Sequence, residues 1–191
     1  MTGRIVILAS GDGSLAQAVM DACRNGAIDA EVQAVVSDQP KARVLDRARS
    51  ADINVCILPM HPERSTWDSA ILAQMRQLSP DLVVSAGFMR LLSAEFVASI
   101  KVINTHPSLL PLFPGAHPVR DTLKAGASVT GATVHWVDAG LDSGEVIAQL
   151  EVPILNGDSE STLHERIKIA ERILIVATIK SLLPKLEILN G

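Results

Sequence analysis

The sequence predicts an α/β fold, namely a Rossmann-like, mainly parallel, twisted sheet with helices on both faces and antiparallel strands added in the carboxy-terminal half. Two observations support this prediction. In the first half of the chain, short and nearly continuous apolar runs alternate with amphipathic segments, which is typical of parallel strands buried on both faces. In the second half, residues 130–137 alternate between apolar and polar side chains, which indicates an antiparallel strand added to the sheet.

The first half is expected to contain five strands, at residues 5–9, 32–36, 55–58, 82–85 and around 102–103. Helices are expected between them, at residues 15–24, 41–50 and 65–80. Asn25-Gly26 ends the first helix, and Ser65-Thr66-Trp67-Asp68 has the spacing of a capping box at the start of the third. A second antiparallel strand is expected at residues 145–152. A long closing helix then has one apolar face, formed by Leu163, Ile167, Ala170, Leu174 and Ala177.

Length and composition indicate one globular domain over residues 1–191. Apolar residues make up 48% of the chain, yet no segment approaches the ~18 apolar residues of a membrane span, so no membrane partner is expected. The net charge of −4 disfavours a nucleic-acid partner, which would favour a basic face. The amino terminus runs directly into the first predicted strand, so we expect no signal peptide and a cytoplasmic protein. Cys23 and Cys56 lack metal-type spacing and are interpreted as small buried side chains in a reducing compartment, and no metal is predicted.

The strongest candidate for a catalytic segment is Asn104-Thr105-His106-Pro107-Ser108-Leu109-Leu110-Pro111. It places an amide and an imidazole two residues apart, directly after the apolar run 101–103, and Pro107, Pro111 and Pro114 stiffen the loop that follows. Polar groups on a braced loop at a strand end are typical of active sites. The alternative is an Asn and a His that only cap a turn. The prolines and the partner segments favour the active site.

A glycine-containing loop, Ser10-Gly11-Asp12-Gly13-Ser14, joins the first strand to the first helix. Glycines let the backbone approach a ligand, and the N–H groups at a helix start favour an anion, so the loop predicts a phosphate monoester site. Two alternatives stay open. One is a tight turn without a ligand, and the other is a dinucleotide-binding fingerprint, indicating an NAD-dependent oxidoreductase, formed by Gly11, Gly13 and Ala16 with Asp38.

Ligands bind outside the carboxyl ends of the strands in open α/β sheets. Residues 10–14, 87–90 and 104–106 follow the first, fourth and fifth strands and are therefore expected to line one cleft. Residues 86–92 offer a glycine and apolar side chains that suit a flat heteroaromatic ring, although an ordinary connection would have the same composition. Residues 138–144 form either a solvated turn or the source of a carboxylate for His106. A carboxylate there would favour the imidazolium and make His106 a competent general acid. The other histidines are interpreted as structural or solvated: His61, His117, His135 and His164.

The segment 104–111, with Gly87-Phe88-Met89-Arg90 before it and Leu141-Asp142-Ser143-Gly144 after it, resembles the folate-dependent formyltransferases. The resemblance runs from about Ile5 to Ile179 and implies a formyltransferase fold. It implies transfer of the formyl group of 10-formyltetrahydrofolate, the co-substrate, to an amine. The glycine loop, the length and the closing helix point to members that act on 5′-phosphoribosylglycinamide (GAR) in purine synthesis. The resemblance also implies that the amino-terminal half binds GAR and its phosphate, that the carboxy-terminal half binds the folate, and that Leu110-Pro111 is a cis peptide.

Residue roles carry over by position from this resemblance. Asn104 matches the donor to the developing oxyanion, His106 the acid that shares this task, and Asp142 the aspartate that keeps the imidazole charged. The residues implied for GAR are Gly11, Asp12, Gly13, Ser14, Leu15, Gly87, Pro107, Lys168 and Glu171. Those implied for the folate are Arg64, Phe88, Met89, Arg90, Leu91, Leu92, Asn104, Val137, Asp138, Ala139, Gly140, Leu141 and Asp142.

Two features of the glycine loop depart from the family pattern. Many family members have Asn where this chain has Leu15, so backbone N–H groups and Ser14 must hold the phosphate alone. Asp12 adds a negative charge beside the proposed phosphate and must therefore point away from it. Arg64 and Arg90 are expected to pair with the carboxylates of the folate.

Other formyl-folate enzymes are the nearest alternatives. A methionyl-tRNA formyltransferase usually has an additional carboxy-terminal domain, and a formyltetrahydrofolate hydrolase an amino-terminal regulatory domain. A chain that starts at its first strand and ends at Gly191 is expected to be neither. The dinucleotide-binding alternative gives Asn104 and His106 no role. The oligomeric state, monomer or homodimer, stays open.

Overall fold

A computed structural model describes residues 2–190 of the chain. It contains seven strands: β1 (Gly3–Leu8), β2 (Ala30–Ser37), β3 (Asn54–Ile57), β4 (Leu82–Ser85), β5 (Val102–His106), β6 (Val129–Trp136) and β7 (Val146–Pro153). Its helices are α1 (Ser14–Arg24), α2 (Arg43–Ser50), α3 (Arg64–Leu78), α4 (Ala94–Ser99), α5 (Pro118–Lys124) and α6 (Glu160–Asn190).

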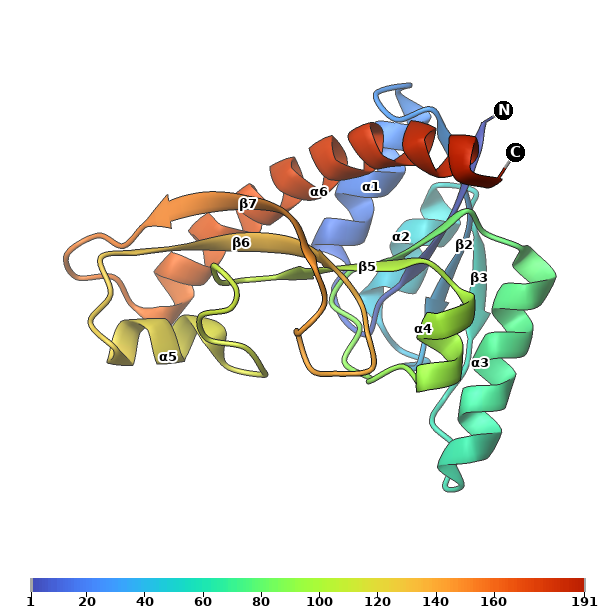
Figure 1. Cartoon of the computed structure of the whole chain (residues 1–191), viewed down its shortest axis with the longest axis horizontal. Coiled ribbons are helices and arrows are strands. Elements are labelled where there is room, and N and C mark those ends of the chain that lie inside the picture. The colour runs from blue at the N-terminus through green and yellow to red at the C-terminus, as the bar shows by residue number, and fades with distance from the viewer. Residues whose placement is uncertain (1, 191) are drawn as a thin grey trace.

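All seven strands form one sheet in the order β3-β2-β1-β4-β5-β6-β7. The strands β1 to β5 pair in parallel, whereas β6 pairs antiparallel with both β5 and β7. The sheet is strongly twisted, so that β6 and β7 run across the direction of β1 to β3 (Figure 1). This mixed sheet confirms the predicted fold class.

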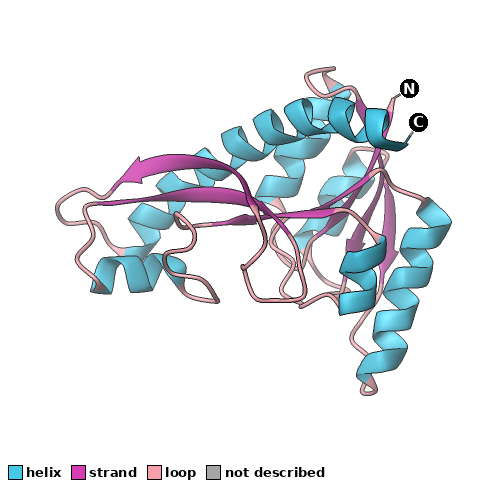
Figure 2. Cartoon of the chain, viewed as in Figure 1, coloured by secondary structure: helices cyan, strands magenta, loops and turns pink. Residues whose placement is uncertain are grey.

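Helices cover both faces of the sheet, as Figure 2 shows. On one face α1, α2 and α6 pack against Ile5 and Ile7, and on the other α3 and α4 pack against Val6 and Leu8. Successive side chains of β1 therefore enter opposite cores, because side chains alternate across a strand. Burial on both faces is the physical reason why these strands are continuous apolar runs in the sequence.

The end of β5 differs from the prediction. Asn104 and His106 lie within the last three residues of β5 and not in the loop after it. Asn104 pairs with His135 and His106 pairs with Thr133 on β6. Because an antiparallel neighbour continues the ladder, these polar residues stay in strand conformation, which the apolar pattern alone did not indicate.

The capping box predicted at residues 65–68 is also wrong. The helix α3 begins at Arg64, its preceding residue Glu63 makes no side-chain cap, and the hydroxyl of Ser65 donates to the Glu63 carboxylate. With the start one residue earlier, Ser65 lies inside the first turn, where its backbone dihedrals cannot be those of a cap. Apart from the closing helix, which extends from Glu160 to Asn190, the other predicted strands and helices begin and end within about two residues of the expected positions.

The two short helices α4 and α5 were not predicted from the sequence, although each begins with a residue that is typical of a helix start. The hydroxyl of Ser93 accepts a hydrogen bond from the Phe96 N–H and starts α4, and Pro118 occupies the first turn of α5. On α6 the predicted apolar face is buried as far as Leu174, but Ala177 is exposed. The buried face continues through Thr178 and Ile179 instead.

The two cysteines are free and half-buried, with Cys23 against one core and Cys56 against the other. Burial raises the pKa of Cys23 to about 11, so its thiol stays protonated at neutral pH and behaves as a small apolar group. Within residues 2–190, no helix combines the length and the apolar character that a membrane crossing requires.

Candidate active site

A cavity of about 540 Å³ lies at the carboxyl ends of β4 and β5. Its walls come from the segment after β4, the end of β5, the start of α5, the loop after β6 and the first turns of α6. These segments are far apart in the sequence. The sheet brings residues 87–90 and 104–106 together in this cavity, as their positions at strand ends predicted.

His106 is buried at the floor of this cavity and faces an acceptor with each ring nitrogen. Its Nε2 lies 2.9 Å from the carbonyl oxygen of Phe113, and its Nδ1 lies 3.4 Å from Oδ2 of Asp142. Only 4% of His106 is exposed. Each ring nitrogen of His106 therefore has an oxygen atom as its neighbour, which fixes the orientation of the ring. The expected contact between His106 and a carboxylate of the 138–144 loop is present.

Asn104 is held by a second histidine. The Nδ1 of His135 lies 2.8 Å from the carbonyl oxygen of Trp136, so this nitrogen carries the proton of the neutral ring. Burial, partly opposed by the Trp136 carbonyl, holds the pKa of His135 below its ordinary value, which favours that neutral ring. Nε2 is then an acceptor for the Asn104 amide nitrogen, 3.2 Å away. This hydrogen bond fixes the amide so that its second N–H is available to the cavity.

Asp142 connects the two histidines. Besides its contact with His106, its Oδ1 lies 3.7 Å from Nε2 of His135, and its Oδ2 accepts the N–H of Gly115 at 2.9 Å. Asp142 has φ of 51°, in the left-handed region that non-glycine residues rarely adopt. The loop after β6 thus turns back sharply to bring this carboxylate under the imidazole.

The chain after His106 is anchored to β6 and β7. The hydroxyl of Thr133 donates to the carbonyl of Ser108, and the Leu110 N–H donates to that hydroxyl. Gln149 donates to the Leu110 carbonyl at 2.8 Å. The Leu110-Pro111 peptide is cis, as expected. This anchoring places the Phe113 carbonyl against His106.

One wall of the cavity carries large apolar side chains that are open to solvent. Met89 is 74% exposed, Leu91 58% and Leu141 59%. Exposed apolar side chains gathered at a concave surface indicate a site for a ligand with apolar faces. Glu160, His117 and His164 add polar groups to the same cavity.

Arg90 does not have the expected free guanidinium. Its Nε lies 2.7 Å from Oδ2 of Asp38, whose side chain is fully buried. Although burial opposes ionisation, hydrogen bonds from Ser10, Gln39 and Arg90 hold the pKa of Asp38 below its ordinary value. Arg90 lines the cavity, but its Nε pairs with Asp38 and its side chain is 35% exposed.

The same ion pair is evidence against dinucleotide binding. In that reading the carboxylate of Asp38 would accept hydrogen bonds from a ribose. Here both of its oxygens are already occupied, Oδ1 by Ser10 and Oδ2 by Gln39 and Arg90. The Ser10 hydroxyl in turn accepts the N–H of Met89 at 2.9 Å. Asp38 is a structural link between the glycine loop and the cavity wall.

Comparison with known proteins decides the family. Residues 3–179 match the formyl transferase family. The chain belongs to that family. A phosphoribosylglycinamide formyltransferase of Mycobacterium tuberculosis is 50% identical over 94% of this chain and 84% of its own length. One of Escherichia coli is 41% identical over 89% and 82%.

Solved structures of formyl transferases share the fold. A glycinamide ribonucleotide transformylase from Symbiobacterium toebii superposes with a TM-score of 0.94 at 37% identity, covering 96% of this chain and 89% of its own. A phosphoribosylglycinamide formyltransferase from Brucella melitensis gives 0.91 at 38% identity, covering 96% of both chains. The seven-stranded sheet of this formyl transferase is thus shared by its relatives.

In this formyl transferase, the cavity unites most of the residues implied for the folate and part of those implied for GAR. Asn104, His106 and Asp142 lie together in it. The other predicted residues that line it are Gly87, Phe88, Met89, Arg90, Leu91, Leu92, Pro107, Val137, Asp138, Gly140 and Leu141. Ala139 is not among the lining residues.

The glycine loop precedes α1 and does not line that cavity, so the expectation that residues 10–14 share one cleft with residues 87–90 and 104–106 is wrong for this cavity. Gly13 has φ of 80°, and a Cβ there would overlap the Val44 side chain. The Asp12 carboxylate pairs with Arg43 and Arg47, as a charge that must point away from an anion would. Among the described residues, the Ser14 hydroxyl makes no hydrogen bond. Its freedom and the unpaired N–H groups at the helix start are compatible with the predicted anion site.

Arg64 is also engaged within the protein. Its guanidinium pairs with Asp68 at 2.8 Å, donates to the Leu91 carbonyl, and lies 5.2 Å from the centre of the Trp67 ring. It does not line the cavity, although Leu91 does. A contact between Arg64 and a ligand would need part of this arrangement to open.

Lys168 and Glu171 lie farther along α6. Glu171 follows His164 by seven residues, hence on the same helix face, and only 9% of it is exposed. Burial raises its pKa to about 7, partly opposed by Lys168 and Arg172. The ammonium of Lys168 pairs with Glu165 at 2.7 Å. Neither residue lines the cavity.

Three histidines interpreted as structural or solvated lie in the cavity wall: His117, His135 and His164. The sequence feature that could have identified His135 as a site residue was its position on the strand next to the one that carries Asn104 and His106. The antiparallel register that puts it opposite Asn104 could not be read from the sequence. Within residues 2–190, no group of three His, Cys, Asp or Glu side chains is arranged to hold a metal ion.

Proposed function

We propose that this chain transfers the formyl group of 10-formyltetrahydrofolate to the amine of 5′-phosphoribosylglycinamide, a step of purine synthesis. The observation that carries the proposal is the buried cluster of Asn104, His106, His135 and Asp142 on the cavity floor. Family membership and the printed names of the relatives support the reaction class and the substrate.

The reaction begins when the neutral amine of the substrate attacks the formyl carbon. The carbonyl oxygen becomes an oxyanion in the tetrahedral intermediate. The Asn104 amide, held by His135, offers its second N–H to that oxygen. A donor of this kind contributes about 2.7–4 kcal/mol of transition-state stabilisation, because it is oriented before charge develops.

His106 acts as the second electrostatic partner and as the acid. As imidazolium it stabilises the oxyanion and assists transfer of a proton to N10 of the folate, so that the C–N bond can break. The proton lost by the attacking amine balances the proton gained at N10. Asp142 keeps the imidazole charged and oriented, as the 3.4 Å contact supports. No covalent intermediate with the enzyme is needed.

Placement of the two substrates follows from the two halves of the site. The apolar wall of Met89, Leu91 and Leu141 suits the flat pterin ring, which would stack on side chains and bind backbone groups at its edge. The glycine loop holds the phosphate of GAR through the N–H groups of α1 and the Ser14 hydroxyl. Bringing amine and formyl carbon together removes entropy from the barrier.

The test is mass spectrometry of GAR incubated with the enzyme and 10-formyltetrahydrofolate, with parallel reactions that lack GAR or lack enzyme. We expect formylated GAR only when all three are present. Asn104→Ala is expected to lower kcat by about 10² to 10³ and His106→Ala by at least about 10². Loss of the cofactor to formate without GAR would instead indicate a hydrolase, and no turnover in any reaction would refute the proposal.

A further inference from the structure

Three successive residues of the glycine loop are held by α2. The N–H of Val44 donates to the Gly11 carbonyl at 3.2 Å. The side chain of Val44 also fills the space where Gly13 has no Cβ. Between them, Nε of Arg47 donates to the Asp12 carbonyl at 2.8 Å. The conformation of the loop is therefore set by α2 as well as by its own glycines.

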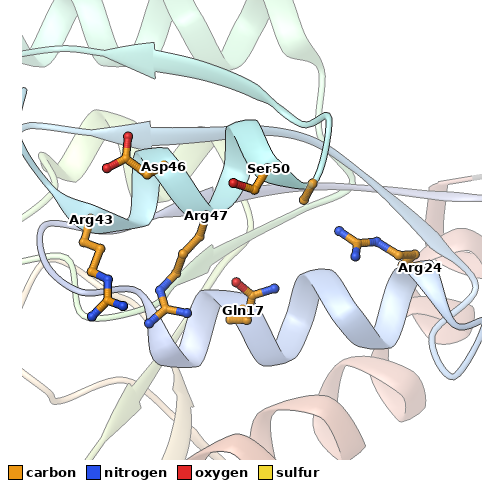
Figure 3. A pocket seen from close by; sticks show the side chains of 7 residues that line it. Gln17, Arg24, Arg43, Asp46, Arg47 and Ser50 are labelled. Carbon is orange, nitrogen blue, oxygen red and sulfur yellow. The ribbon is translucent and has the colours of Figure 1, made fainter.

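Asp12 also has its charge neutralised from α2. Its Oδ1 lies 3.1 Å from Arg43 and its Oδ2 lies 2.9 Å from Arg47. Figure 3 shows both arginine side chains reaching from α2 toward the start of α1, where the loop ends. Both arginines line a groove between α1 and α2. The Asp12 carboxylate is consequently drawn to the α2 side of the loop.

The two arginines are not equivalent. Arg47 bonds the backbone carbonyl and the carboxylate of Asp12 through two different nitrogens, and only 26% of its side chain is exposed. Arg43 makes a single contact and its side chain is 73% exposed, so solvent screens it more. A planar guanidinium suits the double contact of Arg47, which a lysine cannot reproduce.

The pairing of Arg43 and Arg47 with Asp12 would help the loop to bind a phosphate. An unpaired carboxylate one residue from Gly13 would repel the incoming anion. The N–H groups of Ser14, Leu15 and Ala16 lack acceptors inside α1, as at any helix start, and they bind an anion only if the loop before them holds its shape. Leu15 has no side-chain donor, so a phosphate at this loop would depend on the backbone N–H groups and the Ser14 hydroxyl.

We propose that Arg47, assisted by Arg43, is a positioning residue for the phosphate of GAR: it turns the Asp12 carboxylate away, neutralises it, and fixes the loop so that the N–H groups face the ligand. The proposal rests on the function proposed above. Arg47 does not touch the phosphate and acts through Asp12. Its removal should therefore weaken binding of GAR and leave the chemical step and the folate site unchanged.

The experiment measures kcat and the KM of both substrates for Arg47→Ala, Arg47→Lys and the double variant Arg47→Ala/Asp12→Asn. Arg47→Ala is expected to raise the KM of GAR about tenfold, the change that corresponds to loss of one charged hydrogen-bond arrangement. Arg47→Lys should lie between it and the wild type. In the double variant, removal of the carboxylate charge should recover the part of the affinity that repulsion removed, whereas the part that depends on the hydrogen bond to the Asp12 carbonyl should stay lost.

Arg49→Ala is the matched control. Arg49 lies on the same helix and pairs with Asp46 at 2.9 Å, but it does not contact the loop. Its KM values should equal those of the wild type, and thermal melting of each variant without ligands reports any loss of folding. An unchanged KM of GAR in Arg47→Ala, an equal rise in both KM values, or no recovery in the double variant would overturn the proposal. Absence of formylated GAR with the wild-type enzyme would instead overturn the function on which it rests.

Discussion

Nδ1 of His106 lies 3.4 Å from Oδ2 of Asp142, while Nε2 of the same ring faces the Phe113 carbonyl. A histidine at the end of β5 and an aspartate in the loop after β6 are thereby joined under one cavity. Each contact places negative charge or a lone pair beside an imidazole nitrogen. The two contacts therefore fix the orientation of the His106 ring in the cavity where the proposed reaction takes place.

Asp142→Asn tests this relationship. An amide keeps the shape of the carboxylate and can still accept the Gly115 N–H, but it supplies no charge to favour the imidazolium. We expect kcat to fall by about 10² with little change in either KM. Single-turnover measurements at neutral pH would determine it. Asp81→Asn, which alters a surface pair with Arg4, serves as the control. An unchanged single-turnover rate would show that Asp142 has no part in the chemical step.

His135→Phe tests how Asn104 is held. The substitution keeps a ring of similar size and removes the acceptor for the Asn104 amide. The amide can then rotate, so that its N–H is no longer fixed before charge develops. We expect kcat to fall about tenfold, a smaller loss than for Asn104→Ala, because the donor is still present. Combining both substitutions should add nothing to Asn104→Ala alone, and a further additive loss would contradict the positioning role.

Glu171 makes stability depend on pH. Its pKa is about 7 in the folded protein, raised by burial from an ordinary value of 4.5. Below about pH 4.5 both the folded and unfolded states bind the proton. Between there and pH 7 the unfolded state ionises first, so the free energy of unfolding falls as pH rises. The cumulative loss is on the order of 3 kcal/mol and levels off above pH 7.

Glu171→Gln should remove that dependence. Urea unfolding of the ligand-free proteins at pH 5 and pH 8 would compare the two. The difference between variant and wild type is expected to shift in favour of the variant at pH 8. Saturating GAR should reduce the shift, because donors from the substrate would stabilise the ionised carboxylate. A difference that is the same at both pH values would contradict this assignment of the pKa.

Asp38→Asn tests the buried ion pair with Arg90. The substitution leaves a guanidinium with a neutral partner and disturbs the hydrogen bonds from Ser10 and Gln39. We expect a loss of about 3 kcal/mol in the free energy of unfolding, at the lower end for a buried pair because Arg90 is partly exposed. Asp46→Asn breaks an exposed pair and should cost under about 0.5 kcal/mol. Similar losses for both variants would refute a special role for Asp38.

The sheet and most helices could be predicted because burial on both faces leaves a direct mark on the sequence. Residues such as Val6 and Ile7 must both be apolar when each enters a different core. The end of β5 has no such apolar pattern in the sequence. Asn104 and His106 are polar for chemical reasons and belong to the strand because β6 pairs with them, which is a long-range contact.

The candidate site divides in the same way. Asn104 and His106 were found from residue type and position at a strand end, because cavities of α/β sheets form there. The residues of the 138–144 loop indicated only a carboxylate for His106, and the family resemblance selected Asp142. The register that brings His135 opposite Asn104 was not accessible, nor was the pairing of Arg90 with Asp38. Whether an arginine is free or already paired depends on neighbours distant in sequence. The position of Arg90 was predicted, but its availability to a ligand was not.

The strand order has one more consequence for the proposed reaction. The glycine loop follows β1 and His106 ends β5, and β4 alone lies between them. Adjacent strands are about 4.8 Å apart, so the two ends of the site are separated by roughly 10 Å. This spacing sets the distance that the acceptor must span between its phosphate and its amine. A molecule whose amine lies closer to its phosphate could place the phosphate at the glycine loop, but its amine would not reach His106. The distance between the phosphate and the amine of the acceptor then becomes a criterion of substrate choice. Backbone hydrogen bonds between strands set this distance, so a side-chain substitution would not change it.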